Sequence, residues 1–301
     1  MTKILCCGRK INFTEVSNMD AVHFLNTGHS DCIILESCGR FAMVDAAEDT
    51  EYPADMPWLK GKGYEKEVCD YLLKNCADEN GSVTLDFVVG THAHSDHIGG
   101  FDTVIANPAI TVKKAYLKPY SDDCTNLYER KRWDNDVVYR QMKAALEAKS
   151  VPIIENFEGE KTTLGNFKIT FFNGSRAENA RKSGENTSSV VVLLEVHGKR
   201  AVLAGDLNYR FSAEKKISAK IGRVDLLKVA HHGYARSSTA AWLKNLSPQI
   251  DVICNEKRAV HASVMHRLKK YTGAEIYTTA DCNGVKAVFM PDKIEMQIDI
   301  M

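Results

Sequence analysis

The sequence lacks an excess of either charge and has no long apolar run. Lys and Arg number 39, and Asp and Glu also number 39, so the formal net charge is zero. This balance gives no electrostatic reason to expect tight binding to nucleic acid or an anionic membrane, although nucleic acid stays open as a ligand. No apolar stretch approaches the roughly 20 residues of a spanning helix, and Ile4–Cys7 is too short for the core of a signal peptide. We therefore expect a cytoplasmic protein without a membrane partner, and we leave its oligomeric state open.

Paired cysteine motifs are also missing. Nine cysteines occur, which is an odd number, and no two have CxxC spacing. A disulfide framework and a cysteine-rich zinc site are both disfavoured by this pattern. Free thiols in a reducing compartment are the simpler interpretation.

Short β-rich runs alternate with helical patterns, and no low-complexity linker separates them. The nearly continuous apolar run Leu85–Thr91 predicts a buried strand, and apolar residues at helical spacing predict a helix over Tyr128–Lys149. Strands cluster at both ends of the chain, which favours an α+β fold of two face-to-face sheets flanked by helices. We expect one domain over residues 1–301. Further strands are expected at Ala21–Asn26, Cys32–Glu36, Phe41–Asp45, Val112–Leu117, Ser189–Val196, Ala201–Ala204 and Val224–Val229, and further helices at Tyr64–Lys74, Ile98–Ala106, Arg210–Ile221 and Ser263–Tyr271.

Metal-binding side chains are concentrated directly after the strand Leu85–Thr91. Within six residues the chain places His92, His94, Asp96 and His97. Imidazole and carboxylate are suitable donors for zinc and similar divalent ions. In a turn that leaves a strand, the first two histidines can point one way and the other two residues another way, so the motif can serve two adjacent ions. We expect Gly99 and Gly100 to leave room for the backbone beside the metals.

Two later strands end in polar residues in the same manner. AVLAG is followed by Asp206, and LLKVA is followed by His231 and His232. Taken alone, Asp206 could be a turn residue and the histidine pair could be structural. Neighbouring side chains in an extended segment face opposite ways, so both histidines cannot easily reach one metal. We assign His232 as the ligand and His231 as a nearby substrate or acid group, with the reverse assignment left open.

These motifs together resemble the metallo-β-lactamase superfamily over nearly the whole chain. Its HxHxDH hallmark corresponds to His92–His97, its early structural Asp to Asp45, and its bridging Asp to Asp206. VHFLNTGHSDCIILES, ENTSSVVVLLEV and LLKVAHHG are similar to the hydrolase-like domain of the competence protein ComEC. FAMVDAAED, LDFVVGTHAHSDHIGG, AYLKPYSD and RWDND are similar to the catalytic domain of the pneumococcal phosphorylcholine esterase.

The resemblance implies an αββα four-layer sandwich with the metals at one edge between the sheets. It also implies a metal-dependent hydrolase, most specifically a dinuclear phosphodiesterase or phosphoesterase that acts on a small-molecule or other phosphodiester substrate. Two divalent ions, Zn²⁺ first and Mn²⁺ or Fe as alternatives, would share Asp206 and a hydroxide. Asp96 would orient the attacking water in addition to binding metal, and His231 or His261 would protonate the leaving group.

One departure from the superfamily concerns the ligands of the first ion. Many members carry a further histidine between HxHxDH and the bridging Asp, whereas His197, the histidine available here, falls in a predicted hairpin turn. The two similar branches have Asn and Ser in this region, which Asn186, Ser188 or Ser189 would match. A lid-like insertion is expected at about 116–140, where aromatic residues could contact substrate or simply pack on the core. The candidate substrate-binding residues are Asn186, Ser189, Lys118, Tyr120 and Trp133.

Other functions are compatible with the same motifs. A thioester or lactone hydrolase could use this fold, because fold alone does not choose the substrate, and the ComEC-like resemblance also admits a nuclease. Di-iron oxygen chemistry is disfavoured because His94 stands where those relatives resemble HxExD. A non-enzymatic metal-binding scaffold is the least favoured reading, since the motifs are intact.

Overall fold

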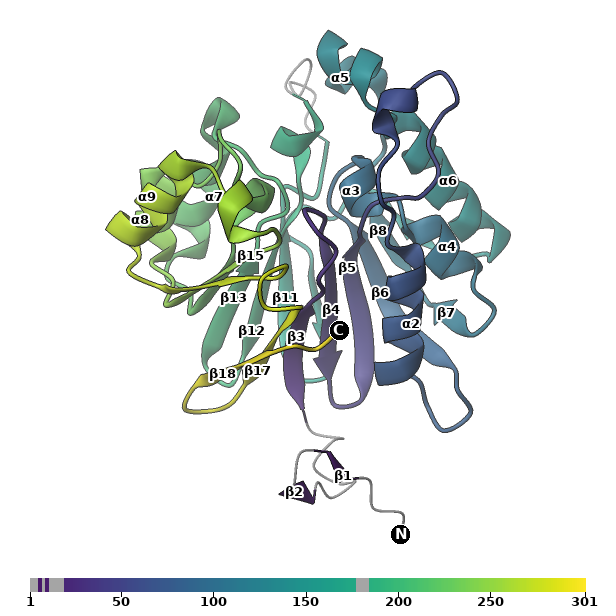
Figure 1. Ribbon diagram of the computed structural model, residues 1–301. Coiled ribbons are helices and arrows are strands. Elements are labelled where there is room, and N and C mark those ends of the chain that lie inside the picture. The colour runs from purple at the N-terminus through teal and green to yellow at the C-terminus, as the bar shows by residue number, and fades with distance from the viewer. Residues whose placement is uncertain (1–4, 7–8, 11–18, 177–183) are drawn as a thin grey trace.

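The computed structural model describes residues 5–6, 9–10, 19–176 and 184–301. Two sheets pack face to face and carry helices on their outer faces (Figure 1). This arrangement confirms the predicted αββα class. The first sheet runs in the order β18 (Ile294–Ile298), β17 (Val285–Phe289), β3 (Asp20–Phe24), β4 (Cys32–Ser37), β5 (Arg40–Ala46), β6 (Val83–Gly90), β8 (Ala115–Leu117) and β9 (Ile153–Ile154), with β7 (Ile110–Val112) also paired to β6.

The second sheet holds seven strands and pairs antiparallel at one side and parallel at the other. Its order is β10 (Lys161–Leu164), β11 (Phe167–Phe172), β12 (Val191–Val196), β13 (Lys199–Leu203), β14 (Leu226–Lys228), β15 (Ile250–Ile253) and β16 (Glu275–Thr278). A separate small pairing joins β1 (Leu5–Cys6) to β2 (Arg9–Lys10).

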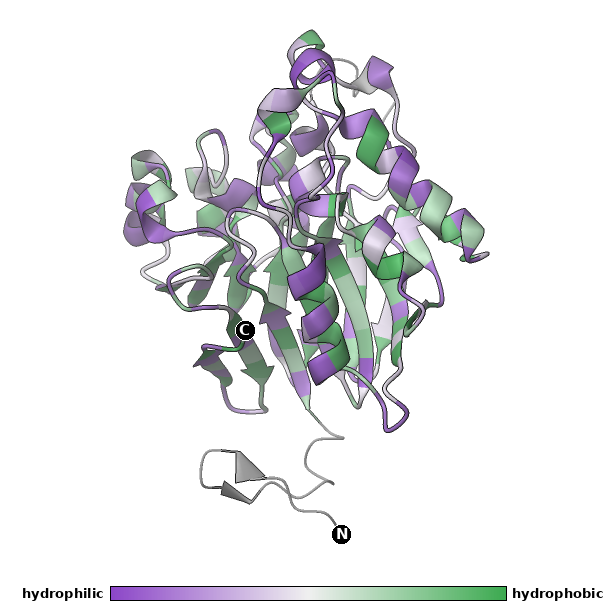
Figure 2. Cartoon of the chain, turned by 45° about the vertical axis from the view of Figure 1, so that its right-hand side comes forward, coloured by the Kyte–Doolittle hydropathy of each residue, from purple (hydrophilic) through white to green (hydrophobic). Residues whose placement is uncertain are grey.

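Each sheet is covered by its own group of helices. The nine-stranded sheet carries α2 (Glu65–Asn75), α4 (Phe101–Ala106) and α6 (Asn135–Ala148), and the seven-stranded sheet carries α7 (Ala213–Ile221), α8 (Ala240–Leu246) and α9 (Ala262–Tyr271). Figure 2 shows the strands largely hydrophobic and the helices two-sided, with hydrophilic residues toward solvent. Two shorter helices, α3 (Ser95–Ile98) and α5 (Leu127–Arg132), lie near the edge where the two sheets meet the loops.

Alternation along the central strands builds the core on both faces of each sheet. In β4, Ile33 and Leu35 join the cluster between the sheets, whereas Cys32 and Ile34 face the helices of the first layer. Because side chains alternate with a period of two, a strand that is apolar at every position must be buried on both faces. The uninterrupted apolar runs in the sequence therefore mark the central strands, which fix the position of the loops that follow them.

The parallel strands in both sheets deliver their carboxyl ends to one edge of the sandwich. β5, β6, β8 and β9 are parallel in the first sheet, and β13 to β16 are parallel in the second. The three motifs that carry candidate ligands follow β6, β13 and β14. The sheet topology thus brings segments more than 100 residues apart in sequence to a common edge.

Three predicted elements differ from the structure. The predicted strand Val112–Leu117 is two short strands, β7 and β8, interrupted at residues 113–114. The predicted helix Tyr128–Lys149 is interrupted by extended backbone at Trp133. The apolar spacing belongs to α6 alone, since no residue of α5 is buried. The predicted helix Arg210–Ile221 begins as the short turn η4 (Arg210–Ser212), in which Phe211 has left-handed backbone.

The remaining sequence expectations concern thiols and membrane segments. Among side chains that the structure describes, the cysteines are free thiols, namely Cys32, Cys38, Cys69, Cys76, Cys254 and Cys282. The other three, Cys6, Cys7 and Cys124, have side chains outside the described part. None of the helices in the described ranges combines the length and apolar character that crossing a membrane requires.

Candidate metal centre

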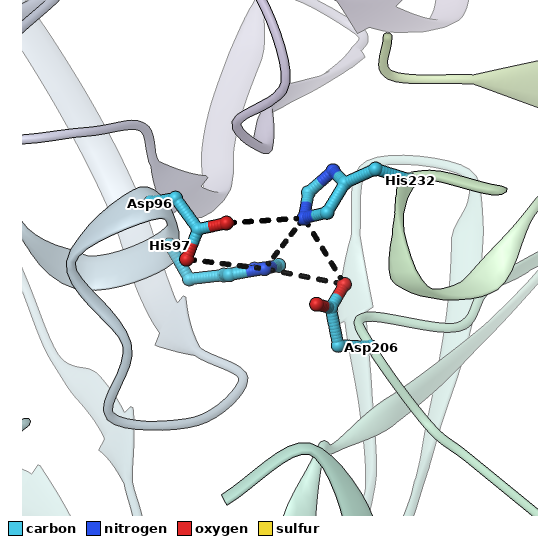
Figure 3. Close-up of side chains that lie close together, drawn as sticks. All are labelled: Asp96, His97, Asp206 and His232. Atoms are coloured by element: carbon cyan, nitrogen blue, oxygen red, sulfur yellow. Dashed lines mark hydrogen bonds and ion pairs between the residues drawn. The ribbon is translucent and has the colours of Figure 1, made fainter. Parts of the chain in front are cut away.

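Four side chains converge at the edge shared by the two sheets (Figure 3). His97 Nε2 and His232 Nε2 lie 3.1 Å apart, and each lies 3.2 Å from Asp206 Oδ1. Asp96 Oδ2 lies 3.3 Å from His232 Nε2. These ligand atoms lie within 4.8 Å of one another, so one cation could contact all four. Asp96 and His97 follow a strand of the nine-stranded sheet, and Asp206 and His232 follow strands of the seven-stranded sheet.

The polar atoms of this cluster fit a metal better than they fit one another. Asp206 Oδ1 is buried and makes no hydrogen bond of acceptable geometry, despite the two imidazole nitrogens nearby. Buried polar groups are nearly always satisfied in native proteins. Two imidazoles and two carboxylates are also a donor set that zinc and related divalent ions prefer. Asp96, His97, Asp206 and His232 could therefore hold one divalent ion.

A second pair of donors lies beside the first cluster. His92 Nε2 and His94 Nδ1 are 3.1 Å apart, and the His92 and His97 rings are 4.1 Å apart between centroids. Ser189 Oγ lies 3.3 Å from His92 Nδ1 and accepts a hydrogen bond of 3.1 Å from the backbone N–H of Asp206. The two histidines could hold another ion next to the first.

Asp45 of β5 holds Thr91 and His97 of the first motif in position. Its carboxylate accepts hydrogen bonds from the backbone N–H and the hydroxyl of Thr91, at 2.8 and 2.7 Å. His97 Nδ1 donates to the same carboxylate at 2.7 Å. This contact leaves His97 Nε2 facing the cluster, which is how carboxylates outside a metal centre commonly orient histidine ligands.

The two glycines after the motif have a different role from the one expected. A Cβ at Gly99 would lie 2.5 Å from Ser95 O and 2.8 Å from Asp49 N, and one at Gly100 would lie 2.4 Å from Ala46 O. They allow close packing of the loop on the end of β5, rather than clearance beside the metals.

The histidine pair after β14 adopts left-handed backbone at both positions, with φ of 56° for His231 and 50° for His232. An extended segment was expected, so the argument from alternating side chains does not apply directly. The two side chains still point in different directions. His232 Nε2 enters the cluster, whereas His231 Nε2 lies 3.9 Å from Asp206 Oδ2 and the His231 side chain is partly accessible. Asn255 Nδ2 donates to His232 O at 3.0 Å and helps to hold this turn.

Burial and mutual charge shift the pKa values of the cluster strongly. Burial lowers the pKa of His232, but Asp206 and Asp31 outweigh it and bring the pKa to about 9. Burial likewise opposes the charged form of His97, yet its carboxylate neighbours raise its pKa well above the usual value. Burial would raise the pKa of Asp206, but His232 and His97 hold it well below its usual range. Protons on the imidazoles thus compensate carboxylate charge that a cation would compensate when bound.

A cavity of about 590 Å³ opens directly over the cluster. Asp96, Asp206, His231 and His232 form part of its lining. The lining also contains acidic and aromatic side chains, namely Glu48, Tyr128, Glu129, Trp133 and Asp134. Its basic side chains include His29, Arg210 and Arg236.

The predicted substrate residues fall into two groups. Asn186 and Trp133 line the large cavity, and Asn186 Oδ1 is buried without a hydrogen-bond partner. Lys118 is buried, bonds Asn173 O at 3.0 Å and lines a separate small cavity behind His92. The Tyr120 hydroxyl donates to Asp122 at 2.8 Å.

Two further histidines lie away from the large cavity's lining. His261, which the resemblance made a candidate leaving-group acid, caps the start of α9, where its Nδ1 accepts from the backbone N–H of Ser263. His197 lies in the turn between β12 and β13 and contacts Asp20 Oδ2 at 2.7 Å.

Several residues around the centre were missed by sequence reasoning. Asp31 and Lys228 are both fully buried against the cluster, and Glu129 lies close to His94. A lysine inside the apolar strand LLKVA was a usable signal, because lysine is almost never fully buried unless it is paired. His29 and the two arginines carried no comparable signal.

Comparison with known proteins agrees with this geometry. Residues 71–275 match the family described as the β-lactamase superfamily domain. The chain belongs to the metallo-β-lactamase superfamily. This superfamily generally comprises hydrolases or related enzymes, so the chain has a metal-dependent hydrolase fold together with side chains placed to bind metal.

Two curated relatives are similar to the chain over most of its length. Recombination protein 2 of Haemophilus influenzae is 23% identical over 304 residues, covering 98% of this chain and 32% of the relative. ComE operon protein 3 of Bacillus subtilis is 23% identical over 279 residues, covering 89% of this chain and 33% of the relative. The chain therefore spans about a third of the length of each.

Solved structures support the superfamily fold. The metallo-β-lactamase fold protein YhfI from Bacillus subtilis has a TM-score of 0.54 at 13% identity, covering 90% of this chain and all of that one. Zn²⁺-bound PqqB from Methylobacterium extorquens has a TM-score of 0.51 at 13% identity, covering 88% of this chain and 99% of that one. At these identities the similarity shows the shared fold.

Proposed function

We propose that the protein is a dinuclear metal-dependent phosphodiesterase, or more broadly a phosphoesterase. The observation that carries the proposal is the position of the cluster around Asp206, beside the His92–His94 pair and under a cavity whose lining includes two arginines. Such a site offers cation-binding groups at the reacting centre and positive charge for an anionic substrate. The similarity to ComEC-like proteins supports the same substrate class.

The ligand set supports two divalent ions, with Zn²⁺ as the first choice. Asp96, His97 and His232 would hold one ion, His92 and His94 would hold the other, and Asp206 would contact both. Imidazole-rich sites suit zinc, and manganese or iron are the alternatives. By the resemblance to the superfamily, Asn186, Ser188 or Ser189 would take the place of a further imidazole, so the His92–His94 ion would receive more oxygen ligands.

The chain's own groups can perform the remaining steps of hydrolysis. Bound divalent ions supply a water of lowered pKa and offset negative charge on the phosphoryl oxygens. Asp96, whose side chain is the most accessible of the four cluster residues at 22% exposure, would orient the attacking water. Its partner His232 fixes one carboxylate oxygen at 3.3 Å, which leaves the carboxylate a defined orientation toward the cavity.

His231 is the candidate for moving the proton. Its Nδ1 lies 3.1 Å from Ala235 O, which can only accept, so Nδ1 carries a proton and Nε2 faces the cavity. Burial lowers the pKa of His231, and Asp206 opposes that shift. A neutral His231 presents an unprotonated Nε2, which can take a proton from the attacking water and return it to the leaving alcohol.

Two arginines in the cavity lining favour an anionic substrate. Arg210 and Arg236 make no ion pair with any residue in the described ranges, so their guanidinium groups are available to an anion. Guanidinium matches phosphate geometry with two parallel hydrogen bonds. The Haemophilus relative is a recombination protein, which keeps a nucleic-acid phosphodiester among the candidate substrates.

The test measures metal content and turnover in one protein preparation. Protein purified without a metal-affinity tag is analysed for bound metal and assayed on bis-(p-nitrophenyl) phosphate, a thioester and a lactone. Asp206→Ala is compared with wild type, and His197→Ala serves as a control histidine distant from the centre. We expect about two equivalents of metal and phosphodiester turnover that Asp206→Ala loses and His197→Ala keeps.

Each other result selects a different function. Two metals with turnover of the thioester or lactone alone would replace the phosphodiesterase proposal with one of those hydrolases. Less than one metal and no turnover after addition of Zn²⁺ or Mn²⁺ would overturn the enzyme proposal and leave a scaffold.

A further inference from the structure

An ion pair between Lys228 and Asp31 lies directly behind the metal centre. Both side chains are fully buried, and Lys228 Nζ contacts Asp31 Oδ2. Lys228 also donates to Gly205 O at 3.0 Å, one residue before Asp206, and lies 3.9 Å from Asp206 Oδ1. Lysine is therefore tied to both the backbone and the side chain of the segment that delivers Asp206.

Asp31 connects this pair to the two histidines of the cluster. Its Oδ1 lies 3.4 Å from His232 Nδ1, and its Oδ2 lies 3.7 Å from His97 Nδ1. The backbone N–H of Asp31 donates to Asp96 O at 3.0 Å. Asp31 thus contacts the rear of three candidate ligands, although it does not line the cavity and cannot reach a substrate there.

The neighbours of His232 decide which of its ring nitrogens faces the cluster. Nδ1 lies near Asp31 Oδ1 and 3.2 Å from Cys254 O, and both of these groups are acceptors. In the neutral ring these acceptors place the proton on Nδ1, so Nε2, the nitrogen toward Asp206, is the one that can bind an ion. Fixing the tautomer in this way is how groups outside the ligand set usually raise metal affinity.

The charge of Lys228 offsets negative charge that is buried around the metal centre. Asp206 is a buried member of the cluster, and Asp31 and Asp45 are buried within a few ångströms of it. Carboxylates in a protein interior repel one another, and an unpaired buried charge is strongly destabilising. Lys228 supplies permanent positive charge among them, so part of the carboxylate charge is compensated whether or not an ion is bound.

We propose that the Lys228–Asp31 pair is a positioning element that holds Asp206 and His232 in metal-binding geometry before an ion arrives. It acts through the ligands and has no contact with substrate. The proposal rests on the metal centre of the proposed function, but it does not depend on which ester is hydrolysed.

The test replaces the pair by apolar residues of similar size. Lys228→Met combined with Asp31→Leu removes one positive and one negative charge, so the net charge near the ions is unchanged. Buried ion pairs replaced in this way often leave stability unchanged or increased. We expect the double variant to keep a wild-type unfolding temperature in excess chelator, while its dissociation constant for Zn²⁺, measured by chelator competition, rises roughly 10- to 100-fold.

Single variants and a control complete the design. Lys228→Met alone leaves the Asp31 charge buried, so we expect its metal-free form to unfold at a lower temperature than either wild type or the double variant. Lys286→Met breaks the ion pair with Glu36, at 2.8 Å in another part of the first sheet, and we expect it to leave the Zn²⁺ dissociation constant unchanged.

The outcomes separate this proposal from the proposed function. A folded double variant that binds Zn²⁺ as tightly as wild type would overturn the positioning role and leave the enzyme proposal intact. If the double variant does not fold, Asp31→Asn decides, and an unchanged Zn²⁺ dissociation constant there has the same meaning. Wild-type protein that binds no metal would overturn both proposals, whereas wild-type metal binding without ester turnover would count against the enzyme proposal alone.

Discussion

Glu129 Oε2 lies 3.9 Å from His94 Nε2, the ring nitrogen that does not face His92. Glu129 belongs to α5, within the segment expected to be a lid, and the Trp133 ring lies 6.2 Å from the His94 ring between centroids. Burial would lower the pKa of His94, but Glu129, together with the charges of Asp96 and Glu185, outweighs burial and raises it. The segment that borders the cavity is therefore also in contact with a candidate metal ligand.

Replacing Glu129 by Gln should weaken the ion at the His92–His94 pair. The carboxylate can fix the His94 ring with Nδ1 toward the ion, and loss of such a partner typically reduces metal affinity roughly 10- to 100-fold. We expect the second equivalent of Zn²⁺ to be lost first in a chelator titration. Glu147→Gln, on the exposed side of α6, is the matched control. Equal titration curves for Glu129→Gln and wild type would show that this contact does not matter for the ion.

The two adjacent histidines should have separable effects. His232→Ala removes a nitrogen that lies 3.2 Å from Asp206 Oδ1, so we expect loss of about one equivalent of metal by elemental analysis. His231→Ala should keep both equivalents and lose most of its turnover, because its Nε2 faces the cavity. The opposite pattern would reverse the two assignments.

Arg210 and Arg236 of the cavity lining should matter for anionic substrates alone. Arg210→Gln with Arg236→Gln removes two guanidinium groups, and a hydrogen bond to a charged group contributes about 1.5 kcal/mol at the low end, or roughly tenfold in affinity. We expect KM for bis-(p-nitrophenyl) phosphate to rise roughly tenfold or more, with kcat less affected, and KM for an uncharged ester to stay constant. Arg258→Gln, which is exposed elsewhere, controls for net charge. A KM that rises equally for both substrates would argue against anion binding by these two arginines.

Asp251 should make stability depend on pH independently of any metal. Burial raises its pKa to about 7, against a hydrogen bond from Thr272 Oγ1 at 3.1 Å. Between about pH 4 and 7 the unfolded chain loses this proton while the folded chain keeps it, so the contribution of Asp251 to stability falls as the pH rises, by about 1.4 kcal/mol per unit or roughly 4 kcal/mol in total.

Asp251→Asn tests this linkage. Asparagine keeps an acceptor for Thr272 and cannot ionise, so the difference in free energy of unfolding between variant and wild type should shift in favour of the variant from pH 4 to pH 7. Chemical denaturation at several pH values measures it. A difference that stays constant over this range would contradict the raised pKa.

The strands of the centre were predictable because burial leaves a direct trace in the sequence. The run Leu85–Thr91 is nearly continuously apolar, and all of it except Thr91 lies in the buried strand β6. Elements whose sequence is mixed were harder. β10, with the sequence KTTL, lies at the edge of its sheet with one buried residue, and no strand was predicted there.

The candidate ligands could be found from the sequence because several donors share one short motif, whereas their partners could not. Asp31 precedes the cluster by more than 60 residues, and Glu129 lies on a helix without buried residues. Their proximity to the histidines depends on tertiary packing, which single-sequence patterns do not contain. Local backbone was equally hidden, since nothing in the sequence HHG indicates left-handed conformation at both His231 and His232.

The candidate ligands come from both layers of the sandwich. Asp96 and His97 follow a strand of one sheet, and Asp206 and His232 follow strands of the other. An ion held by all four would join the sheets at this edge as a cross-link does, so the sheets could not separate there until coordination was broken. The rate of unfolding would then depend on the supply of the ion, as catalysis does. The time for which the chain resists proteases would depend on that supply in the same way.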